Sequence, residues 1–423
     1  MSLSPILSMR RRGRTLTKKC KSMKIVQINA VYEFSSTGRT TREMHEYLNL
    51  KGIDSYVFCA NIDRPDNKIF KIGTNADHKL HALGSRLFGL QGYFSSIPTK
   101  KMLKKIEVIN PDVVILRNFH ANYINIPKVL NFLGTHNIPT IIVLHDCYFF
   151  TGHCCYYTKD QCNKWKVECN HCPILNKYNS SLFFDNSRKI FNDKKKYFHS
   201  IKRLAVVGVS DWVTNEAKQS PILTGAHIIR RIYNWIDQNV FYPRDARSYR
   251  EMYGIKEEDY VVLGVAQGWG DVKGLPQFIK LAQEMPDIKV VLVGELTQTN
   301  LPQNLIRIGR ISSTEQLAMF YSMADVFVNF SIQETFGKVA AEALSCGTPI
   351  IVNQSTANPE LCGEGCGKIV EHRDWKEVME KVIEIRKERK TTYTERCRSF
   401  AVQNFDKEKG LLQYIDLFNE LVN

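Results

Sequence analysis

The chain has 423 residues, of which 43% are hydrophobic and 24% are charged, and its formal net charge is +15. This length predicts two domains, and the composition excludes disordered and fibrous proteins. Seven of the positive charges lie in residues 1–22, which contain no acidic residue. A net positive charge favours binding to a nucleic acid, an anionic membrane or an anionic small molecule, and composition alone does not distinguish these partners.

Residues 1–22 are predicted to form a disordered basic leader. Their apolar part, Leu3 to Met9, is short and precedes the basic cluster, which is the reverse of a signal peptide. Met23 begins a strand-like segment, so we expect it to be the natural initiator. The chain has no apolar run approaching the 18 residues of a membrane span, which predicts no transmembrane helix. The expected location is the cytoplasm, where cysteine thiols stay reduced.

After Met23, short β-branched runs alternate with amphipathic stretches. The predicted strands of the first half are Lys24–Asn29, Ser55–Cys59, Asp112–Leu116, Thr140–Leu144, Leu204–Val209 and His227–Ile232. Those of the second half are Tyr260–Ala266, Lys289–Val293, Leu305–Ile308, Val326–Asn329 and Pro349–Val352. The predicted helices include Thr40–Lys51, Ile126–Leu133, Leu275–Glu284, Thr314–Met323, Val339–Ser345 and Asp374–Lys387. Near-continuous apolar strands alternating with helices indicate parallel sheets with both faces covered.

Two such series predict an α/β protein with two Rossmann-like domains that face each other across a cleft. The predicted first domain is 23–235, with a cysteine-rich insertion at about 147–180, and the second is 236–406. Residues 407–423 are predicted to form a helix that packs back on the first domain. Because ligands of open α/β sheets bind beyond the carboxyl ends of the strands, we expect the site between the domains.

The most informative segment follows the strand that ends at Asn329 and opens a helix. Glu334 is expected in the loop before that helix and Glu342 inside it. The main-chain N–H groups of Thr335, Phe336 and Gly337 would then lie at a helix start, where a diphosphate is attracted. This assigns Glu334 to sugar hydroxyls and Glu342 to a ribose. Two glutamates on and before a surface helix are the alternative.

This segment resembles the pattern S-x-x-E-[ST]-[FW]-G…E-A-x-x-x-G-x-P of glycosyltransferase family 4. The matching residues are Ser331, Glu334, Thr335, Phe336, Gly337, Glu342, Ala343, Gly347 and Pro349. The resemblance extends from about Met23 to the C-terminus. It implies a GT-B fold in which the first domain binds the acceptor and the second binds a nucleotide-diphosphate sugar.

Lys273, which precedes the predicted helix Leu275–Glu284, also fits this family. The resemblance implies that Lys273 binds donor phosphate, whereas an exposed lysine before a helix is the alternative. The sequence departs from the family five residues earlier, where Gly268 replaces a phosphate-binding arginine. Either Lys273 carries more of the binding, or another cation, Arg310 or Lys338, substitutes for the arginine.

Two positions of the first domain match the family less completely. Gly38 stands where relatives have a glycine-rich loop near the donor phosphates or the acceptor, although a lone glycine can simply shape a turn. His145 ends a predicted strand and precedes Asp146. The resemblance implies that the imidazole or the carbonyl of His145 contacts the transferred sugar and stabilises positive charge at its anomeric carbon.

Six of the twelve cysteines lie between Cys147 and Cys172. The spacing of Cys154, Cys162, Cys169 and Cys172 ends in a C-x-x-C pair and suits tetrahedral zinc. Structural zinc, free thiols and conditional disulfides are all compatible with this spacing. The segment resembles a cysteine-containing subgroup of bacterial surface-polysaccharide enzymes, which share the sequence pattern HDC-aromatic-x-F-T-G-H-C…C-x-K-W…C-x-x-C-P.

The resemblance implies transfer of a hexose-type sugar, with retention, during capsule or O-antigen biosynthesis. We expect no metal cofactor for catalysis and a front-face substitution, because no carboxylate nucleophile is evident. The stretch His81–Lys105 mixes aromatic, apolar and basic residues, which suits an anionic bilayer, a mobile acceptor loop or an ordinary core helix.

The predicted partners are a nucleotide-diphosphate sugar, a glycan or lipid-linked glycan, and the inner face of a membrane. No nucleic-acid partner is expected, since no nucleic-acid motif is recognised. The alternative functions are a GT-B sugar-nucleotide epimerase or phosphorylase, and a basic protein that binds nucleic acid or membrane.

Overall fold

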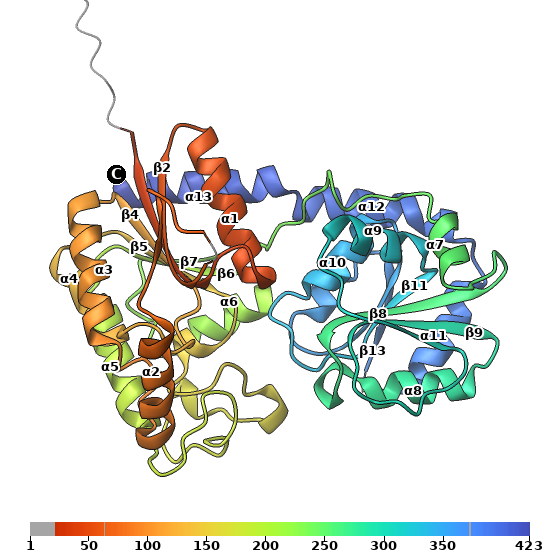
Figure 1. The fold of residues 1–423 in the computed structure, drawn as a ribbon, viewed down its shortest axis with the longest axis horizontal. Coiled ribbons are helices and arrows are strands. Elements are labelled where there is room, and N and C mark those ends of the chain that lie inside the picture. Colours follow the sequence, from red (N-terminus) through yellow and green to blue (C-terminus); the bar gives the residue numbers. More distant parts are fainter. Residues whose placement is uncertain (1–21, 63, 372–373) are drawn as a thin grey trace, which may run out of the picture.

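The structure, a computed structural model, describes residues 22–62, 64–371 and 374–423. The predicted basic leader lies outside these residues, apart from Ser22. The described chain forms two α/β domains, each with a central sheet, and a pair of long helices runs along one side of both (Figure 1).

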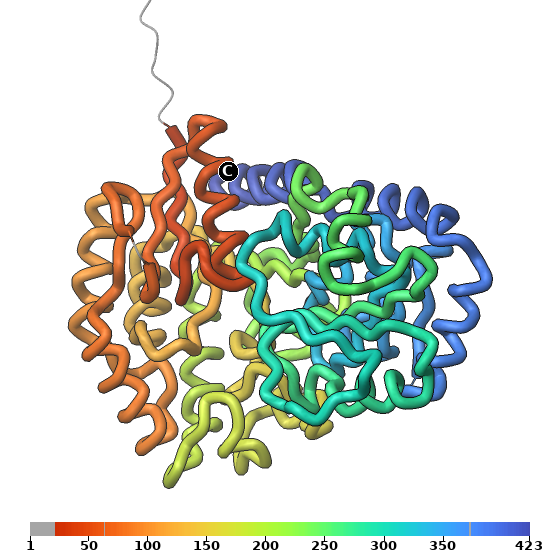
Figure 2. The backbone as a smooth tube through the Cα atoms, turned by 45° about the vertical axis from the view of Figure 1, so that its right-hand side comes forward, coloured from red at the N-terminus to blue at the C-terminus, as the bar shows by residue number. Residues whose placement is uncertain are grey.

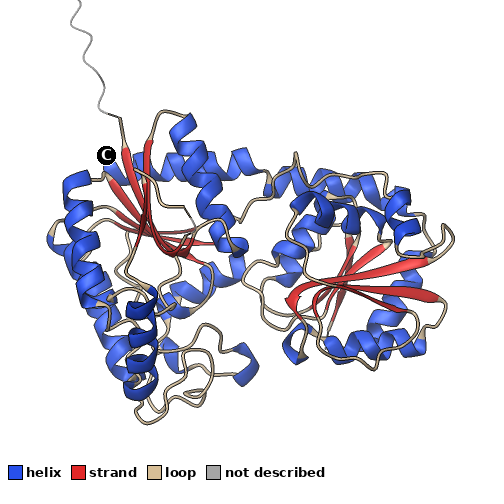
Figure 3. Cartoon of the chain, viewed as in Figure 1, coloured by secondary structure: helices blue, strands red, loops and turns tan. Residues whose placement is uncertain are grey.

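The first sheet has seven parallel strands in the order β3-β2-β1-β4-β5-β6-β7. They are β1 Lys24–Val31, β2 Asp54–Asn61, β3 Ile69–Lys71, β4 Val113–Leu116, β5 Thr140–Leu144, β6 Leu204–Gly208 and β7 Ile228–Arg231. The central strands β4, β5 and β6 are buried along their whole length, as their apolar runs predict. Helices cover both faces of the sheet (Figure 3).

The helices of the first domain are α1 Ser35–Leu50, α2 Asn75–Phe88, α3 Ser96–Ile109, α4 Ile126–Thr135, α5 Ser187–His199 and α6 Asp211–Lys218. The cysteine-rich insertion between β5 and α5 contains the 3-10 turns η1 Tyr148–Phe150, η2 Thr158–Asp160 and η3 Lys164–Lys166. It packs around the buried indole of Trp165, whose ring centroid lies 5.1 Å from that of Phe150.

The second sheet has six parallel strands in the order β10-β9-β8-β11-β12-β13. They are β8 Tyr260–Gly268, β9 Ile288–Glu295, β10 Leu305–Ile308, β11 Val326–Asn329, β12 Ile350–Asn353 and β13 Gly367–Val370. The accompanying helices are α7 Arg247–Met252, α8 Leu275–Glu284, α9 Thr314–Met323, α10 Lys338–Ser345, α11 Trp375–Arg386 and α12 Lys390–Phe405, with turns η4 Asp271–Lys273 and η5 Asn358–Leu361. In both sheets the early strands spread outward from a central first strand, which is the doubly wound arrangement.

Helix α8 shows how local sequence sets the position of Lys273. Gly274 precedes the helix with φ 85°, a left-handed conformation that glycine adopts without strain. A proline follows in the first turn, where its missing N–H costs nothing. The helix then buries Leu275, Phe278 and Leu281 at helical spacing, so Lys273 is held just before the helix at the carboxyl end of β8.

The chain crosses between the domains twice, at adjacent positions. The N–H of Ile236 donates to the carbonyl of Phe405 at 2.8 Å, and Ile236 forms a parallel bridge with Asp406. After the second crossing, α13 Lys407–Val422 lies against the first domain, where Glu420 pairs with Arg230 at 2.6 Å (Figure 2). None of the helices that the structure describes is long and apolar enough to cross a membrane.

Candidate functional site

The segment between β11 and α10 carries the residues that the sequence singled out. Glu334 lies in the loop and Glu342 lies inside α10. The helix begins at Lys338, and Gly337 precedes it with φ 84°, where a Cβ atom would meet the Leu361 side chain at 2.9 Å. The first N–H groups of any α-helix lack intrahelical partners, so this helix start presents donors and a positive dipole end.

Lys273 and Glu334 meet at the carboxyl edge of the second sheet. The Lys273 Nζ atom lies 2.6 Å from Glu334 Oε1 and 3.4 Å from Ser331 Oγ. The main chain of Glu334 is fixed as well, because its N–H donates to Thr356 Oγ1 at 3.0 Å. The predicted phosphate-binding lysine and the predicted sugar-binding carboxylate therefore form one charged pair.

Glu342 is buried, yet only one of its oxygens is hydrogen-bonded. Its Oε2 accepts from the Tyr321 hydroxyl at 2.9 Å. Its Oε1 has no hydrogen-bond partner and lies 3.7 Å from the Arg39 guanidinium of the first domain. A buried carboxylate oxygen without a hydrogen bond is costly in a folded protein, so this atom is suited to accept a ligand hydroxyl.

Arg310 and Lys338 were the two candidates to substitute for the missing arginine, and they lie in different surroundings. Lys338 is half-buried at the start of α10; burial lowers its pKa, and Glu43 of the first domain opposes this shift. Arg310 is 64% exposed and lies 3.9 Å from Glu295. Lys338 is therefore the better placed of the two, because it faces Glu342 and Arg39 in the same charged group.

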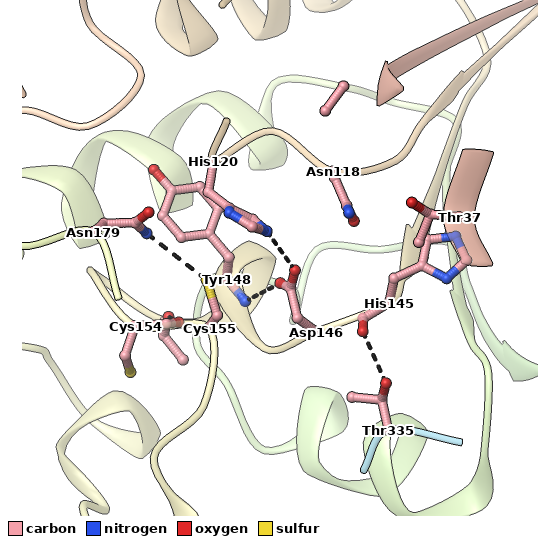
Figure 4. A network of polar contacts seen from close by, with 12 residues as sticks. Thr37, Asn118, His120, His145, Asp146, Tyr148, Cys154, Cys155, Asn179 and Thr335 are labelled. Atoms are coloured by element: carbon pink, nitrogen blue, oxygen red, sulfur yellow. Dashed lines mark hydrogen bonds and ion pairs between the residues drawn. The ribbon is translucent and has the colours of Figure 1, made fainter. Parts of the chain in front are cut away.

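His145 directs its ring and its carbonyl to different partners. An Arg117 guanidinium N–H donates to the His145 Nε2 atom at 3.0 Å, which requires a neutral imidazole because a guanidinium can only donate. Burial and Arg117 together lower the pKa of His145 to about 3. The ring is therefore held inside the first domain by its hydrogen bond with Arg117, and only the carbonyl points toward the second domain (Figure 4).

That carbonyl joins the two domains. Thr335 donates its hydroxyl to the His145 carbonyl at 2.8 Å. The insertion adds further contacts to the same edge of the second domain, since the Tyr178 hydroxyl donates to Gln333 Oε1 at 3.0 Å. Lys159 pairs with an aspartate two residues before Lys273 at 3.1 Å. The carboxyl edges of the two sheets therefore meet around the donor-side segment.

Of two predicted donor-binding residues, Gly38 differs from its expected setting and Phe336, which was expected to act through its main chain, does not. Gly38 was predicted in a loop before a helix beginning at Thr40, but α1 begins at Ser35 and includes it. A Cβ atom on Gly38 would lie 3.2 Å from the Glu33 nitrogen, so the glycine allows the helix to start against the preceding turn. Phe336 is buried with its ring 5.4 Å from that of Phe405, which leaves only its main chain for a ligand.

The four cysteines of the predicted zinc set surround one small cavity in the insertion. Burial raises the pKa of Cys169 to about 12 and that of Cys172 to about 11, and the Gly152 N–H donates to the Cys169 sulfur at 3.2 Å. All eleven cysteines in the described part of the chain are free thiols. Within residues 22–62, 64–371 and 374–423, no three of these sulfurs lie within 4.8 Å of one another, so structural zinc stays a prediction.

Sequence reasoning missed the residues that accompany His145. Arg117 and His120 follow β4, the neighbour of β5 in the sheet. His120 Nε2 lies 2.7 Å from Asp146 Oδ2 (Figure 4). Burial opposes protonation of His120, but Asp146 and Cys155 outweigh it and raise its pKa well above the ordinary value. The position of His120 just beyond a central strand was the signal that could have found it.

The comparisons with known proteins bear first on the second domain. Residues 245–401 match the family model Glycosyl transferases group 1. This group 1 domain contains Lys273, Glu334 and Glu342. Among curated proteins, the chain is 27% identical over 231 residues to N-acetyl-alpha-D-glucosaminyl L-malate synthase of Bacillus anthracis. That match covers 51% of this chain and 60% of the relative's length.

Solved structures extend the likeness beyond the group 1 domain. Sucrose-phosphate synthase from Thermosynechococcus elongatus matches with a TM-score of 0.67 at 17% identity, covering 94% of this chain and 99% of that one. WaaG, a glycosyltransferase involved in lipopolysaccharide biosynthesis, matches with a TM-score of 0.63 at 12% identity over 93% and 99%. Anabaena HepE in complex with UDP matches with a TM-score of 0.61 at 14% identity over 94% and 100%. The chain therefore has the GT-B fold that the sequence predicted.

Proposed function

We propose that this protein is a glycosyltransferase that moves a sugar from a nucleoside-diphosphate donor to an acceptor hydroxyl. The observation that carries the proposal is the Lys273–Glu334 pair at 2.6 Å beside the start of α10, within the group 1 domain. One cation, one carboxylate and a helix N-terminus are the groups that a diphosphate and a sugar need. The UDP bound to the HepE neighbour and the description of the WaaG neighbour as a glycosyltransferase support it.

We assign the following roles to the residues, and their positions support the assignment. Lys273 and the first N–H groups of α10 bind the diphosphate, with Lys338 as the second cation. Glu334 accepts hydrogen bonds from sugar hydroxyls once Lys273 turns to the phosphate. The Oε1 of Glu342, which has no hydrogen-bond partner and lies 3.7 Å from Arg39, accepts from a ribose hydroxyl. These groups fix the donor without a metal ion at its phosphates.

In the proposed step, the acceptor oxygen forms a bond to the anomeric carbon while the bond from that carbon to the diphosphate oxygen breaks. The acceptor proton passes to the departing diphosphate, whose developing charge is stabilised by Lys273 and the helix start. Attack on the same face gives retention. The first domain closes the site through the contact of Thr335 with His145, which excludes water from the reacting centre.

The acceptor we propose is a hexose-type glycan carried on a membrane lipid, as in bacterial surface polysaccharide synthesis. An apolar surface of the first domain supports this choice. Leu80, Leu83 and Phe88 of α2 are exposed, as are the neighbouring loop residues Leu182, Phe183 and Phe184. Phe88 and Phe184 stack with centroids 6.3 Å apart, and exposed Lys79 and Arg86 flank them on α2. We call these six apolar residues the α2 patch; exposed apolar and basic groups together suit an anionic lipid surface.

Transfer is tested with purified protein, a panel of sugar nucleotides and lipid-linked acceptors from a bacterial membrane extract. The expected result is a glycosylated lipid and free nucleoside diphosphate, both reduced at least 100-fold by Glu334→Gln or Lys273→Ala. Lys280→Ala, an exposed lysine of α8, is the matched control and should be unaffected. Normal transfer by both site variants would contradict the proposal. An epimerised sugar nucleotide or a sugar phosphate as product would indicate one of the alternative activities instead.

A further inference from the structure

Three potential metal ligands converge in the first domain from separate segments. His120 follows β4, Asp146 follows β5, and Cys155 belongs to the insertion. The His120 Nε2, an Asp146 oxygen and the Cys155 sulfur all lie within 4.8 Å of one another. Among the residues that the structure describes, these three form the one group of potential ligand atoms close enough together to surround a single ion.

The surroundings orient the three side chains. The Tyr148 N–H donates to Asp146 Oδ1 at 2.8 Å, which directs Oδ2 to His120 at 2.7 Å. The Asn179 amide donates to the Cys155 sulfur at 3.8 Å (Figure 4). Metal sites in proteins use such outer hydrogen bonds to fix the direction of the ligands. Asp146 and Cys155 are buried, whereas the His120 side chain is 25% exposed and gives an ion access from solvent.

The adjacent cysteine faces a different environment. Cys154 lines the cavity of the predicted zinc set, and Figure 4 shows its sulfur pointing away from that of Cys155. The four cysteines of that set are not gathered within the distance that unites His120, Asp146 and Cys155. The structure therefore separates two neighbouring thiols and places only Cys155 among nitrogen and oxygen ligands.

We propose that His120 Nε2, Asp146 Oδ2 and Cys155 Sγ bind one zinc ion. Imidazole, carboxylate and thiolate are the three ligand types that zinc accepts, with bonds of about 2.0–2.3 Å. The ion replaces the proton shared by His120 and Asp146 and the thiol proton of Cys155, and both protons leave to solvent. One thiolate and one carboxylate then balance the charge of the ion, which suits a mostly buried site.

Three protein ligands leave a fourth tetrahedral position for water or another ligand. The buried amine of Lys194 donates to the carbonyls of Tyr148 and Thr151 at 2.5 and 3.0 Å, so it does not occupy this position. The site lies one residue from His145, at the carboxyl end of β5. The inference concerns ion binding alone and stands whether or not the protein transfers sugars.

The test is the metal content of the purified full chain after zinc loading and dialysis, measured by inductively coupled plasma mass spectrometry. Cobalt substitution gives a second readout, because its thiolate charge-transfer absorption grows with the number of sulfur ligands. We expect one zinc per chain and a one-thiolate cobalt spectrum. His120→Ala and Cys155→Ala should each lower zinc affinity by more than the roughly 10–100-fold cost of losing an outer-shell partner.

Two further variants decide between the sites. Cys59→Ala removes a buried thiol of β2 and should keep the ion. Cys169→Ser tests the predicted four-cysteine set and should also keep it. His120→Ala is the informative ligand variant, because its partly exposed side chain can be removed with little effect on packing. The proposal is overturned if the wild-type chain holds no zinc, or if His120→Ala retains all of its zinc. If the wild-type chain held two ions and Cys169→Ser lost one of them, the four-cysteine set would bind a second ion. The site of His120, Asp146 and Cys155 would still stand.

Discussion

Thr335 of the second domain donates its hydroxyl to the main-chain carbonyl of His145 in the first domain, at 2.8 Å. This bond joins the donor-side segment to the end of β5, where the proposed acceptor would approach. It also fixes the direction of His145, whose ring is held on the other side by Arg117. The relationship links closure of the two domains to the geometry of the proposed site.

Thr335→Val tests this link, since valine keeps the shape of threonine and removes the donor. The His145 carbonyl would lose its partner in the closed arrangement, at a cost of about 1–3 kcal/mol. We expect kcat/KM for the donor to fall by roughly 10-fold or more, with little change in thermal stability. Thr135→Val on the exposed surface of α4 is the control. An unchanged kcat/KM would show that this contact is not needed for closure.

Glu342→Gln tests the assignment of the ribose. The glutamine can still accept from the Tyr321 hydroxyl, so the fold should be retained. Its amide lacks the charge that strengthens a hydrogen bond to a ribose hydroxyl. We expect calorimetry to show weaker binding of the matching nucleoside diphosphate, and a smaller difference between that ligand and its 2′-deoxy analogue. If the variant discriminates the two ligands as the wild type does, Glu342 does not contact the ribose.

Lys338→Ala and Arg310→Ala compare the two candidate substitutes for the arginine that Gly268 replaces. Lys338 is half-buried at the start of α10, whereas Arg310 is 64% exposed in the loop after β10. We expect Lys338→Ala to weaken diphosphate binding by about 10-fold, and Arg310→Ala to change it by less than about 2-fold, as for an exposed charge. If calorimetric titrations gave the opposite ranking, Arg310 and not Lys338 would be the second cation that binds the phosphates.

His81 makes stability depend on pH. Its Nε2 accepts the Gly92 N–H at 3.2 Å, and burial lowers its pKa to about 4. In the unfolded chain, His81 becomes protonated below about pH 6.5. In the folded chain, it stays neutral down to about pH 4. The free energy of unfolding should therefore fall by about 3 kcal/mol between these pH values from this residue.

Urea unfolding at pH 7 and pH 4.5 measures this contribution. His81→Gln should flatten the pH dependence, while His136→Gln, at an exposed position, should leave it unchanged. Equal pH dependence in the wild type and in His81→Gln would exclude the contribution of His81.

The α2 patch predicts binding to anionic membranes. We expect the protein to sediment with phosphatidylglycerol vesicles and much less with phosphatidylcholine vesicles, and to lose binding at high salt. Phe183→Ser should weaken sedimentation, because this side chain is 70% exposed in the patch. Leu50→Ser is the control, since Leu50 is 82% exposed but lies on α1. Equal loss in both variants would contradict a specific role of the patch.

Most strands were predictable because burial on both faces leaves continuous apolar runs. Thr140–Leu144 and Leu305–Ile308 have the bounds that the sequence predicted, as do the helices Leu275–Glu284 and Thr314–Met323. The edge strands β3 and β13 were missed, since they are short and only partly buried. The start of α1 was placed five residues too late, because Gly38 was taken as part of a loop.

The site was predictable only where its residues share one segment. The loop from Ser331 to Gly337 carries its own pattern, so Glu334 and Glu342 were placed correctly relative to α10. The grouping of His120, Asp146 and Cys155 depends on three segments that only the sheet order and the insertion bring together. Likewise, the sequence places Cys154 beside Cys155, whereas their side chains face different surroundings.

The central claim is that the second domain binds a nucleoside diphosphate through Lys273 and the start of α10. Its most direct test is the thermal midpoint of the full chain with UDP, GDP, ADP, dTDP or CMP, beside the same series for Lys273→Ala. A ligand at 100 times its dissociation constant adds about 2.7 kcal/mol, which moves the midpoint by several degrees. We predict that one diphosphate raises the wild-type midpoint by this amount and that Lys273→Ala abolishes most of the shift. No shift with any of the nucleotides, or an equal shift in the variant, would contradict the account.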